Sequence, residues 1–437
     1  MNTKFLMFSV FGFLIANGLP AQDTLVLSKR DLIRKVSEGN LQLRISEQNF
    51  KASKADYDQS NSLFLPNISA SHTAISTTNP LMVFGSKLNQ EILGPADFDP
   101  ALLNNPDAVQ NYATRIEILQ PILNFDGAYM RRAARAKMEA GQLQIGRTEE
   151  YLELEAGKVY MQLQLAYKAV EVLKKAKKTA LANGKLIDDY YKQGLLQKTD
   201  VLSMQVRINE VENQLQNALS NVRNESDYLN FLMNNELTDT VYRPIDELSE
   251  VVATKWETLQ FSGNRKDILA MDKSVEAYGK MAKAEKFAFF PRLNAFGSYE
   301  LYDDTLFGTD AGGYTIGVQL SWNLFDGYKT IGKLQKAKVE YEKAQFERAQ
   351  YKAQSQLELN KADRQLKDAE NRVRLVKLNF EQSEEAYRIR QNRFGQGLEK
   401  TTDLLLSETQ MFQKELEYQQ AIFENNFAQD YISFLKQ

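Results

Sequence analysis

Apolar and polar residues alternate along four segments of the chain, and the alternation is cleanest over residues 314–323. One face of that segment carries Tyr314, Ile316, Val318, Leu320 and Trp322, and the other carries Thr315, Gly317, Gln319, Ser321 and Asn323. A period of two residues predicts a β-strand. Residues 292–301 alternate in the same way except at Phe296, and residues 112–119 alternate too. Residues 67–76, mostly Ser, Thr and Ala, predict a weaker fourth strand.

An apolar face opposite a polar one over about ten residues is typical of a membrane barrel strand, with lipid outside and water inside. The aromatic residues on the apolar faces would then lie at the membrane interface, and they are Tyr112, Tyr299, Tyr314 and Trp322. A soluble sheet with one buried face is the alternative. Four strands cannot close a barrel, because eight is the usual minimum. The strands therefore predict an oligomer that shares one barrel in outer-membrane lipid.

Long stretches without proline separate these strands. Only Pro244 and Pro291 follow Pro121, and residues 333–394 contain neither Gly nor Pro. Because proline costs about 3 kcal/mol inside a helix, such gaps permit very long helices, and about 65 residues would span roughly 100 Å. The fold class is therefore mainly α with a small membrane β part. The helices are expected at residues 28–63, 127–193, 200–234, 265–288, 327–394 and 402–435.

The chain repeats one unit of helix, strand, strand, long helix and helix. Four motifs recur in the same order: Phe64 to Ala70 with Phe289 to Ala295, Leu123 to Gly127 with Asn323 to Gly327, Gly194 to Leu202 with Gly397 to Leu405, and Asp227 to Leu232 with Asp430 to Leu435. Ordered matches at a nearly constant spacing indicate a duplication. We expect a first repeat at 22–234, with a β-hairpin at about 67–122 and a long extracellular loop at 78–110, then a linker at 235–264. The second repeat is expected at 265–437, with a hairpin at about 291–323.

Residues 1–21 have the pattern of a secretory signal peptide. Lys4 supplies a positive charge, residues 5–16 are apolar, and Ala21 is a small residue at the expected cleavage site. An uncleaved membrane anchor is the alternative, but the apolar run is shorter than the ~20 residues that a spanning helix needs. The mature protein is expected outside the cytoplasm.

Composition excludes several kinds of function. The chain has no Cys and a single His, His72, so thiolate metal sites and Cys nucleophiles are excluded and a His-rich metal site cannot form. The formal net charge is −3, whereas nucleic-acid binding usually requires a strong basic excess. We expect no cofactor, no metal, no nucleic-acid partner and no catalysis.

Three repeated motifs together resemble the TolC-like outer membrane efflux protein family. The first is an apolar residue followed by proline where a helix meets a strand, at Pro66 and Pro291. The second is Phe-Asp-Gly where the chain returns to a helix, ending at Gly127 and Gly327. The third is a Gly-x5-Asp turn after each long helix, from Gly194 to Asp200 and from Gly397 to Asp403. The resemblance covers nearly all of the mature chain.

The resemblance implies a homotrimer with a shared twelve-stranded β-barrel in the outer membrane. A twelve-helix tunnel would extend into the periplasm, with residues 235–264 in an equatorial region. Members of this family are passive exit channels, so the implied partners are a periplasmic adaptor (membrane fusion) protein and an inner-membrane transporter. The implied process is tripartite efflux or type I secretion.

The resemblance also places a gate at the Gly-x5-Asp turns. Asp403 matches the acidic residue of the pore aperture, and Asp200 matches the acidic residue of the first turn; each follows a threonine, Thr402 or Thr199. The aromatic residue expected before each glycine is Phe394 in the second copy and Tyr191 in the first. Two positions depart from the family, since Leu406 replaces a second aperture acid and Glu399 replaces a basic locking residue. Alternatively, Thr402 or Asp403 only caps the next helix.

Two other functions are compatible with long helices. A non-pore periplasmic coiled-coil scaffold or adhesion protein would treat the alternating strands as part of a soluble sheet. A periplasmic adaptor would have one helical hairpin flanked by β-domains, which the duplicated helices and few strands disfavour. The sequence identifies neither the transported substrate nor the pump class.

Overall fold

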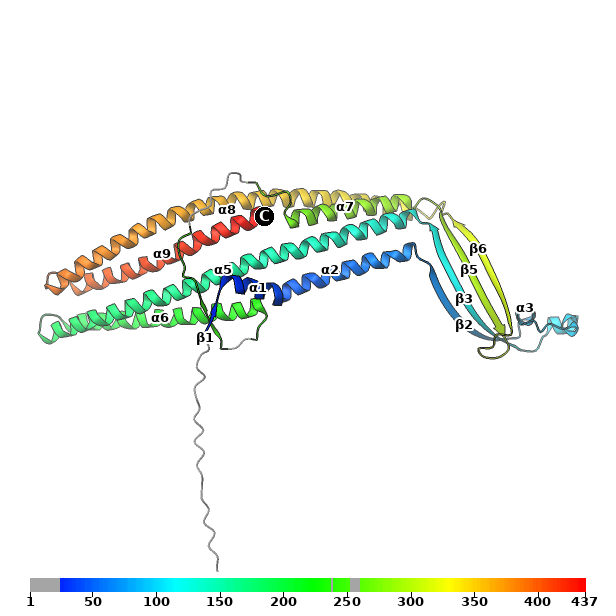
Figure 1. Ribbon diagram of the computed structural model, residues 1–437, viewed down its shortest axis with the longest axis horizontal. Coiled ribbons are helices and arrows are strands. Elements are labelled where there is room, and N and C mark those ends of the chain that lie inside the picture. The colour runs from blue at the N-terminus through cyan, green and yellow to red at the C-terminus, as the bar shows by residue number, and fades with distance from the viewer. Residues whose placement is uncertain (1–23, 237–238, 252–259) are drawn as a thin grey trace, which may run out of the picture. The chain divides into compact units, whose positions relative to one another are not determined.

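The computed structural model describes residues 24–236, 239–251 and 260–437 (Figure 1). The expected signal segment at 1–21 and part of the expected linker lie outside these residues. The chain divides into two compact units. Of the described residues, unit 1 holds 24–41, 149–236, 239–251 and 359–435, and unit 2 holds 42–148, 260–358 and 436–437.

Unit 1 is built mainly from helices. It contains α1 (Lys29–Gly39), α6 (Lys198–Met233) and nearly all of α9 (Thr401–Lys436), together with the C-terminal portions of α5 (Phe125–Lys192) and α8 (Lys329–Gly395). Its two short strands, β1 (Thr24–Leu27) and β4 (Val241–Pro244), pair in parallel. Within the described ranges, no helix combines the length and the apolar character needed to cross a membrane.

The single helix predicted over residues 28–63 was wrong, because the chain breaks after α1. Gly39 lies so close to α6 that an added Cβ would be 2.5 Å from the Met233 carbonyl oxygen. Asn40 is extended, and its side-chain amide donates to the Leu232 carbonyl at 2.8 Å. Asn40 thereby satisfies a carbonyl at the end of α6 that has no partner within the helix. Because the break depends on a contact with a distant segment, the local sequence pattern does not predict it.

Unit 2 contains the sheet and the helices that lead to it. Helix α2 (Leu41–Gln59) and the 3₁₀ turn η1 (Ser60–Leu63) precede β2, and α7 (Lys266–Phe287) precedes β5. The sheet order is β2-β3-β5-β6, with every neighbouring pair antiparallel. The strands are β2 (Asn67–Thr77), β3 (Val109–Leu123), β5 (Arg292–Asp303) and β6 (Ala311–Ser321). All four predicted strands are therefore present, and the mainly α fold with a small β part is confirmed.

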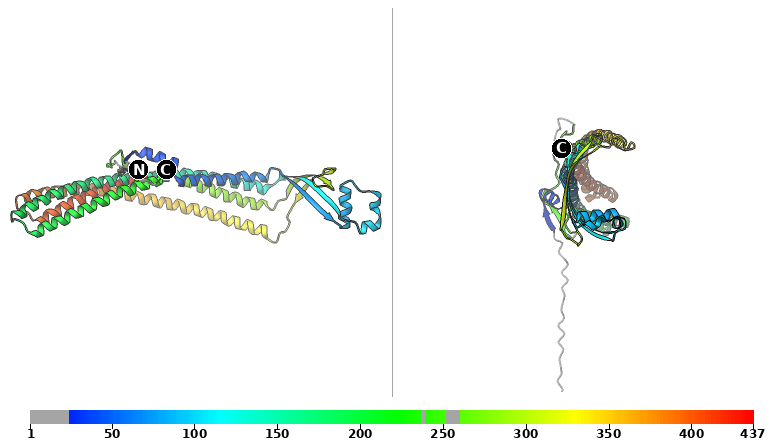
Figure 2. Two further views of the ribbon diagram at one scale, coloured as in Figure 1. Left: turned by 90° about the horizontal axis from the view of Figure 1, so that it is seen from below. Right: turned by 90° about the vertical axis from the view of Figure 1, so that its right-hand side faces the viewer.

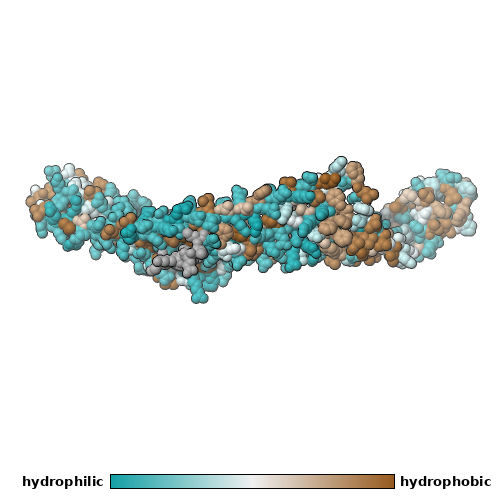
Figure 3. Space-filling view, turned by 90° about the horizontal axis from the view of Figure 1, so that it is seen from above, coloured by the Kyte–Doolittle hydropathy of each residue, from teal (hydrophilic) through white to brown (hydrophobic). Residues whose placement is uncertain are grey.

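The strand faces separate as the alternation predicts. In the register, Ile116 pairs with Tyr299, which pairs with Tyr314, so these apolar residues share one face. Figure 3 shows apolar side chains gathered over this part of the molecule. So many exposed apolar residues on one face of a sheet are unusual. The exposed apolar residues of this face are Ile68, Ile116, Ile118, Tyr299, Tyr314, Ile316, Val318 and Leu320. The opposite face carries charge, with the Arg115 guanidinium 3.3 Å from the Glu300 carboxylate.

The segment expected to be a loop, residues 78–110, instead contains helices. These are α3 (Pro80–Asn89), the 3₁₀ turn η2 (Pro95–Phe98) and α4 (Pro100–Asn104), and Figure 2 shows them beyond the ends of β2 and β3. Asn79 caps α3 and Asp99 caps α4, each immediately before a proline at the first helical position. Proline is well suited to that position because its missing N–H has no partner there anyway. Pro80, Pro95 and Pro100 of this segment therefore start helices rather than prevent them.

A charge on the apolar face of the sheet should be costly if that face contacts lipid. Ile316, 77% exposed at the centre of β6, is the most direct site for this test. We expect Ile316→Lys to destabilise the membrane-inserted protein by about 2–4 kcal/mol per chain. Denaturant titration from lipid vesicles measures this, with Thr315→Lys on the opposite face as the matched control. Equal effects of the two substitutions would show that the face does not contact lipid.

Candidate functional site

The turns that follow the two long helices have the same geometry. Gly194 has φ +75° in the turn between α5 and α6, and Gly397 has φ +72° in the turn between α8 and α9. In both turns the glycine N–H bonds back to the carbonyl three residues earlier, at 2.9 Å. Glycine reaches this left-handed conformation without the steric cost that a Cβ imposes. The repeated glycines thus end their helices in the same way.

The two aspartates of these turns have different surroundings. Asp200 accepts a hydrogen bond from the Gln197 N–H at 2.9 Å and so closes a capping box at the start of α6. Asp403 lies in the first turn of α9, which begins at Thr401, so neither Thr402 nor Asp403 occupies the N-cap position. The Asp403 carboxylate lies 3.9 Å from the Arg390 guanidinium. Asp200 therefore has a clear capping role, whereas Asp403 makes an ion pair.

Glu399, which stands where the family resemblance predicts a basic residue, binds the arginines of α8. Its carboxylate lies 2.9 Å from Arg393 Nε and 3.6 Å from a terminal guanidinium nitrogen of Arg390. Arg393 also donates to the Leu398 carbonyl at 3.2 Å. Glu399 and Asp403 are therefore paired with arginines within the hairpin of α8 and α9, and Arg390 lies between the two carboxylates.

The aromatic residues before the two glycines are not equivalent. Phe394 is buried at 2% exposure, whereas Tyr191 is 38% exposed and lies beneath the Lys198 ammonium. The tyrosine that contacts the other turn is the preceding residue, Tyr190. Its hydroxyl donates to the Gly395 carbonyl at 3.0 Å, and its ring lies 5.8 Å from that of Phe394. Tyr190 thus joins the end of α5 to the end of α8.

A buried polar cluster links all four helices of unit 1 that lead to these turns. Glu408 of α9 is fully buried, and its carboxylate accepts a 2.6 Å hydrogen bond from Asn183 of α5. The Asn183 amide also donates to the Tyr387 hydroxyl of α8 at 3.0 Å. Arg207 of α6 lies 3.6 Å from Glu408, which is an ion-pair distance but too long for a hydrogen bond. We call these four residues the tip network; none of them is among the site residues expected from the sequence.

The tip network lies within an apolar core that α5, α6, α8 and α9 share. That core includes Ile187, Met204, Leu404 and Phe412. Burial raises the pKa of Glu408 above its usual 4.5, although the Asn183 amide and the Arg207 charge partly oppose the shift. Burial likewise raises the pKa of Tyr387 to about 12. An ionised carboxylate is therefore costly at this position, and its proton has a direct effect on helix packing.

Stability should fall with rising pH because of Glu408. A carboxyl whose folded pKa is raised binds more protons in the folded state, so its stabilising contribution is complete below 4.5 and is lost as pH rises through the raised pKa. We expect the unfolding temperature of the wild type to fall relative to that of Glu408→Gln as the pH rises above 4.5. Glu417→Gln is the matched control on α9, because the Lys414 ammonium lowers the pKa of Glu417. A difference in unfolding temperature between the wild type and Glu408→Gln that stays constant above pH 4.5 would contradict this prediction.

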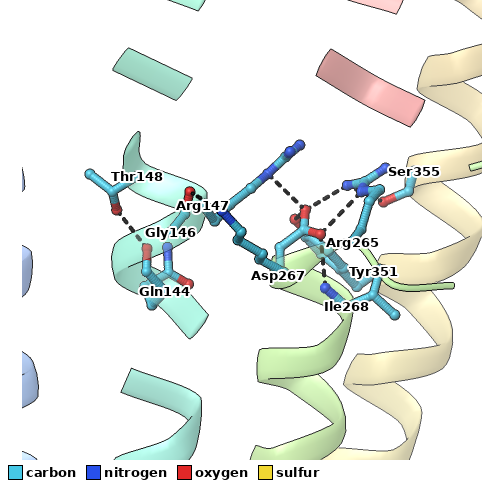
Figure 4. Close-up of polar contacts among 10 residues, drawn as sticks. Gln144, Gly146, Arg147, Thr148, Arg265, Asp267, Ile268, Tyr351 and Ser355 are labelled. Atoms are coloured by element: carbon cyan, nitrogen blue, oxygen red, sulfur yellow. Dashed lines mark hydrogen bonds and ion pairs between the residues drawn. The ribbon is translucent and has the colours of Figure 1, made fainter. Parts of the chain in front are cut away.

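A second buried cluster, in unit 2, is centred on Asp267 at the start of α7 (Figure 4). Its carboxylate binds the Arg265 guanidinium through both oxygens and lies 3.3 Å from Arg147 Nε on α5. The Tyr351 hydroxyl of α8 donates to it at 2.7 Å. Burial raises the pKa of Asp267, but the Arg265, Tyr351 and Arg147 contacts outweigh that effect and leave it lowered. The cluster fixes the start of α7 between two long helices.

The remaining residues singled out in the sequence lie around the sheet. Pro66 and Pro291 immediately precede β2 and β5, and Gly327 has φ +65° just before α8. Gly127 lies inside the first turn of α5, where its N–H donates to the Asn124 side chain. Trp322 follows β6 and donates to the Phe289 carbonyl at 2.9 Å. The Phe-Asp-Gly motifs therefore start the two long helices in different ways.

Tyr112, Tyr299 and Tyr314 lie within the strands of the sheet. Tyr299 pairs directly with Tyr314, and Tyr112 pairs with Ala74 and Asp303 near the opposite end of the strands from Trp322. The geometry thus puts aromatic residues toward both ends of the apolar face. In the part of the chain that the structure covers, no cluster of three His, Asp or Glu side chains could hold a metal ion.

The fold is similar to that of solved outer-membrane proteins, two of which are described as channels. CmeC of Campylobacter jejuni is 14% identical with a TM-score of 0.80, covering 100% of this chain and 93% of that one. VceC of Vibrio cholerae is 16% identical with a TM-score of 0.77, covering 92% and 95%. The open-state channel MtrE of Neisseria gonorrhoeae is 15% identical with a TM-score of 0.75, covering 93% and 88%. At such low identity these matches establish the fold alone.

Sequence comparison identifies the family. No curated protein matches the chain. The family model described as outer membrane efflux protein, however, matches residues 32–235 and 260–432, which together make up most of the chain. Nearly all of both repeats of the helix and strand unit falls within the match. The chain therefore belongs to the outer membrane efflux protein family, and it is an outer-membrane exit channel that extends into the periplasm.

Proposed function

We propose that three copies of this chain form one passive duct, which carries substrates from an inner-membrane transporter through a periplasmic adaptor to the outside. The observation that carries this proposal is the sheet. Its outermost strands, β2 and β6, each pair on one side only within the described chain. A membrane sheet cannot leave a strand edge facing lipid, because unpaired backbone groups are too costly there. Pairing β2 of one copy with β6 of the next closes a twelve-stranded barrel from three copies.

The helices of unit 1 support the periplasmic half of the duct. Four helices per copy, α5, α6, α8 and α9, give twelve in a trimer. The turns at Gly194 and Gly397 then form the end of the tunnel, and the adaptor docks there. Asp403 contributes an acidic ring at the aperture, and its pairing with Arg390 keeps that ring close to α8. Rings of carboxylates favour cations, because symmetry multiplies the local field.

Opening of the aperture requires α8 and α9 to move relative to α5 and α6. The contacts that resist this motion are the Tyr190 bond to Gly395 and the tip network around Glu408. A buried polar cluster whose hydrogen bonds are only partly satisfied can adopt two distinct arrangements more readily than a purely apolar core. Its polar groups can replace hydrogen bonds to one another with hydrogen bonds to water. The adaptor is proposed to bias this equilibrium. The duct itself performs no catalysis.

Cell fractionation followed by native mass measurement tests the assembly. The protein extracted from the outer membrane in mild detergent is expected to have the mass of three mature chains. Co-purification of the adaptor is expected to depend on the α5–α6 and α8–α9 turns. Recovery of a monomer from the soluble periplasm would contradict the proposal and would favour the non-pore scaffold instead.

A further inference from the structure

The insertion between β2 and β3 exposes an apolar helix face. On α3, Leu81 is 82% exposed and Leu88 is 55% exposed, and Gly85 lies between them on the same side of the helix. We call these three residues the α3 face. The buried residues of α3 itself, Val83 and Ser86, lie on the other side of the helix, as a helical period of 3.6 residues requires. The α3 face therefore has no cover within the described chain.

No packing contact among the described residues requires a glycine at position 85. A Cβ added there would meet nothing within 4 Å beyond its own helix, among the described residues. A glycine inside a helix lowers helix stability relative to alanine, because it leaves more backbone freedom to be lost on folding. Such a glycine is well suited to a site where another helix approaches closely. The position between two exposed leucines thus points to a partner.

Gln90 shows on which side of the sheet the insertion lies. Its buried side chain donates to the Gln110 and Asp303 carbonyls and to the Asn111 side chain, at 2.9, 3.1 and 2.9 Å. Asn111 and Arg115 are four residues apart in β3, so their side chains lie on the same face of the sheet, which is the charged face. The end of α3 is therefore fixed over the charged face, which is the water-filled side of a barrel.

We propose that the α3 faces of the three copies pack against one another around the threefold axis and narrow the outer mouth of the duct. The inference rests on the proposed trimer. Helix α3 begins three residues after β2, the edge strand at which neighbouring copies meet, so every copy holds its helix at an equivalent place. Identical apolar faces directed toward one axis can cover each other, and the central glycines permit a close approach.

Charge argues against a lipid surface as the occupant. Helices that lie on membranes usually carry several Lys or Arg residues on their polar side. Residues 78–110 contain a single basic residue, Lys87, against four acidic ones, Glu91, Asp97, Asp99 and Asp107. Lys87 is already paired with Asp97 at 2.7 Å. Another copy of the insertion is therefore the better partner for the α3 face.

Thiol crosslinking of the full-length trimer tests the proposal, because the chain has no native cysteine. We expect Leu81→Cys or Leu88→Cys to give crosslinked dimers with a short bifunctional maleimide. Leu324→Cys, 80% exposed beyond the other end of β6, is the background control. Gly85→Leu should lower the temperature at which the trimer dissociates. Leu81→Asp should increase single-channel conductance, since three charges would repel at the axis.

The outcomes separate this inference from the trimer itself. A trimer in the outer membrane whose Leu81→Cys and Leu88→Cys variants crosslink no more than Leu324→Cys would overturn the inference and leave the duct intact. Quenching of a fluorophore at Leu81→Cys by brominated lipid would identify lipid as the occupant and would also overturn it. A protein that is not trimeric would instead contradict the proposed function.

Discussion

Asp267→Ala is expected to destabilise unit 2 by about 3–5 kcal/mol, the cost of removing one partner from a buried ion pair. The Asp267 side chain is 8% exposed, and the Arg147 and Arg265 side chains that it contacts are 9% and 3% exposed. Removing the carboxylate takes the negative charge from between two buried guanidinium groups. The Tyr351 hydroxyl loses the same acceptor. The start of α7 should therefore separate from α5 and α8.

The matched control for this substitution is Asp272→Ala on the same helix. Asp272 pairs with Arg348 and Lys352, but its side chain is 36% exposed, so its removal should cost about 1 kcal/mol or less. Chemical unfolding of the detergent-solubilised protein measures both. Because the folded pKa of Asp267 is lowered, its contribution is present above pH 3.8 and is lost as pH falls through the lowered value. Equal costs for the two substitutions would show that the cluster is not a major source of stability.

Arg207→Ala is expected to have a comparable effect in unit 1, again about 3–5 kcal/mol at pH values above the raised pKa of Glu408, because it leaves the Glu408 carboxylate buried without its cation. The second substitution Glu408→Gln should recover much of this loss, since an amide needs no counter-charge and can still accept from Asn183. The predicted result is thus a strong positive coupling in a double-mutant cycle.

The control for that cycle is Glu210→Gln. Glu210 lies 3.8 Å from Arg207, but its side chain is 58% exposed. Combining Glu210→Gln with Arg207→Ala should give nearly additive effects. Hydrogen exchange of α9 amides locates the loss, because only helices bound to the tip network should open. If Arg207→Ala costs the same with Glu408 and with Gln at this position, the ion pair contributes nothing to holding α9.

The alternation of apolar and polar residues and the spacing of the prolines and glycines predicted most of the fold, because both depend on local chemistry. The alternation over residues 314–323 identifies a strand whichever chain it pairs with, and it gives the correct faces for Ile316 and Thr315. Long segments free of proline are helical wherever they pack. The turn glycines Gly194 and Gly397 are predictable because their left-handed backbone favours that residue type.

The tip network could have been found in part. Glu408 lies four residues after Leu404 and three before Met411, so it interrupts an apolar stripe, and Arg207 interrupts another between Met204 and Val211. A charge on each of two buried stripes indicates a buried pair. Asn183 and Tyr387 give no such signal, because amides and phenols are common on half-exposed helix faces.

Other features depend on contacts between distant segments. Arg147 and Asp267 are separated by most of a repeat, and one sequence contains nothing that pairs them. The break at Asn40 depends on the end of α6. Residues 78–110 were expected to form a loop, whereas the caps at Asn79 and Asp99 precede prolines that start helices. A capping residue directly before proline is the local signal that predicts this.

Planar-bilayer recording tests most directly whether this chain is a duct with an acidic gate. We expect the purified trimer to give discrete conductance steps with cation preference. Asp403→Ala should raise the mean current, because the shorter side chains of the proposed acidic ring would leave a wider aperture. Asp200→Ala, in the equivalent turn of the first repeat, should not do so. The absence of conductance from purified trimers, with Asp403→Ala as well as with the wild type, would contradict the account.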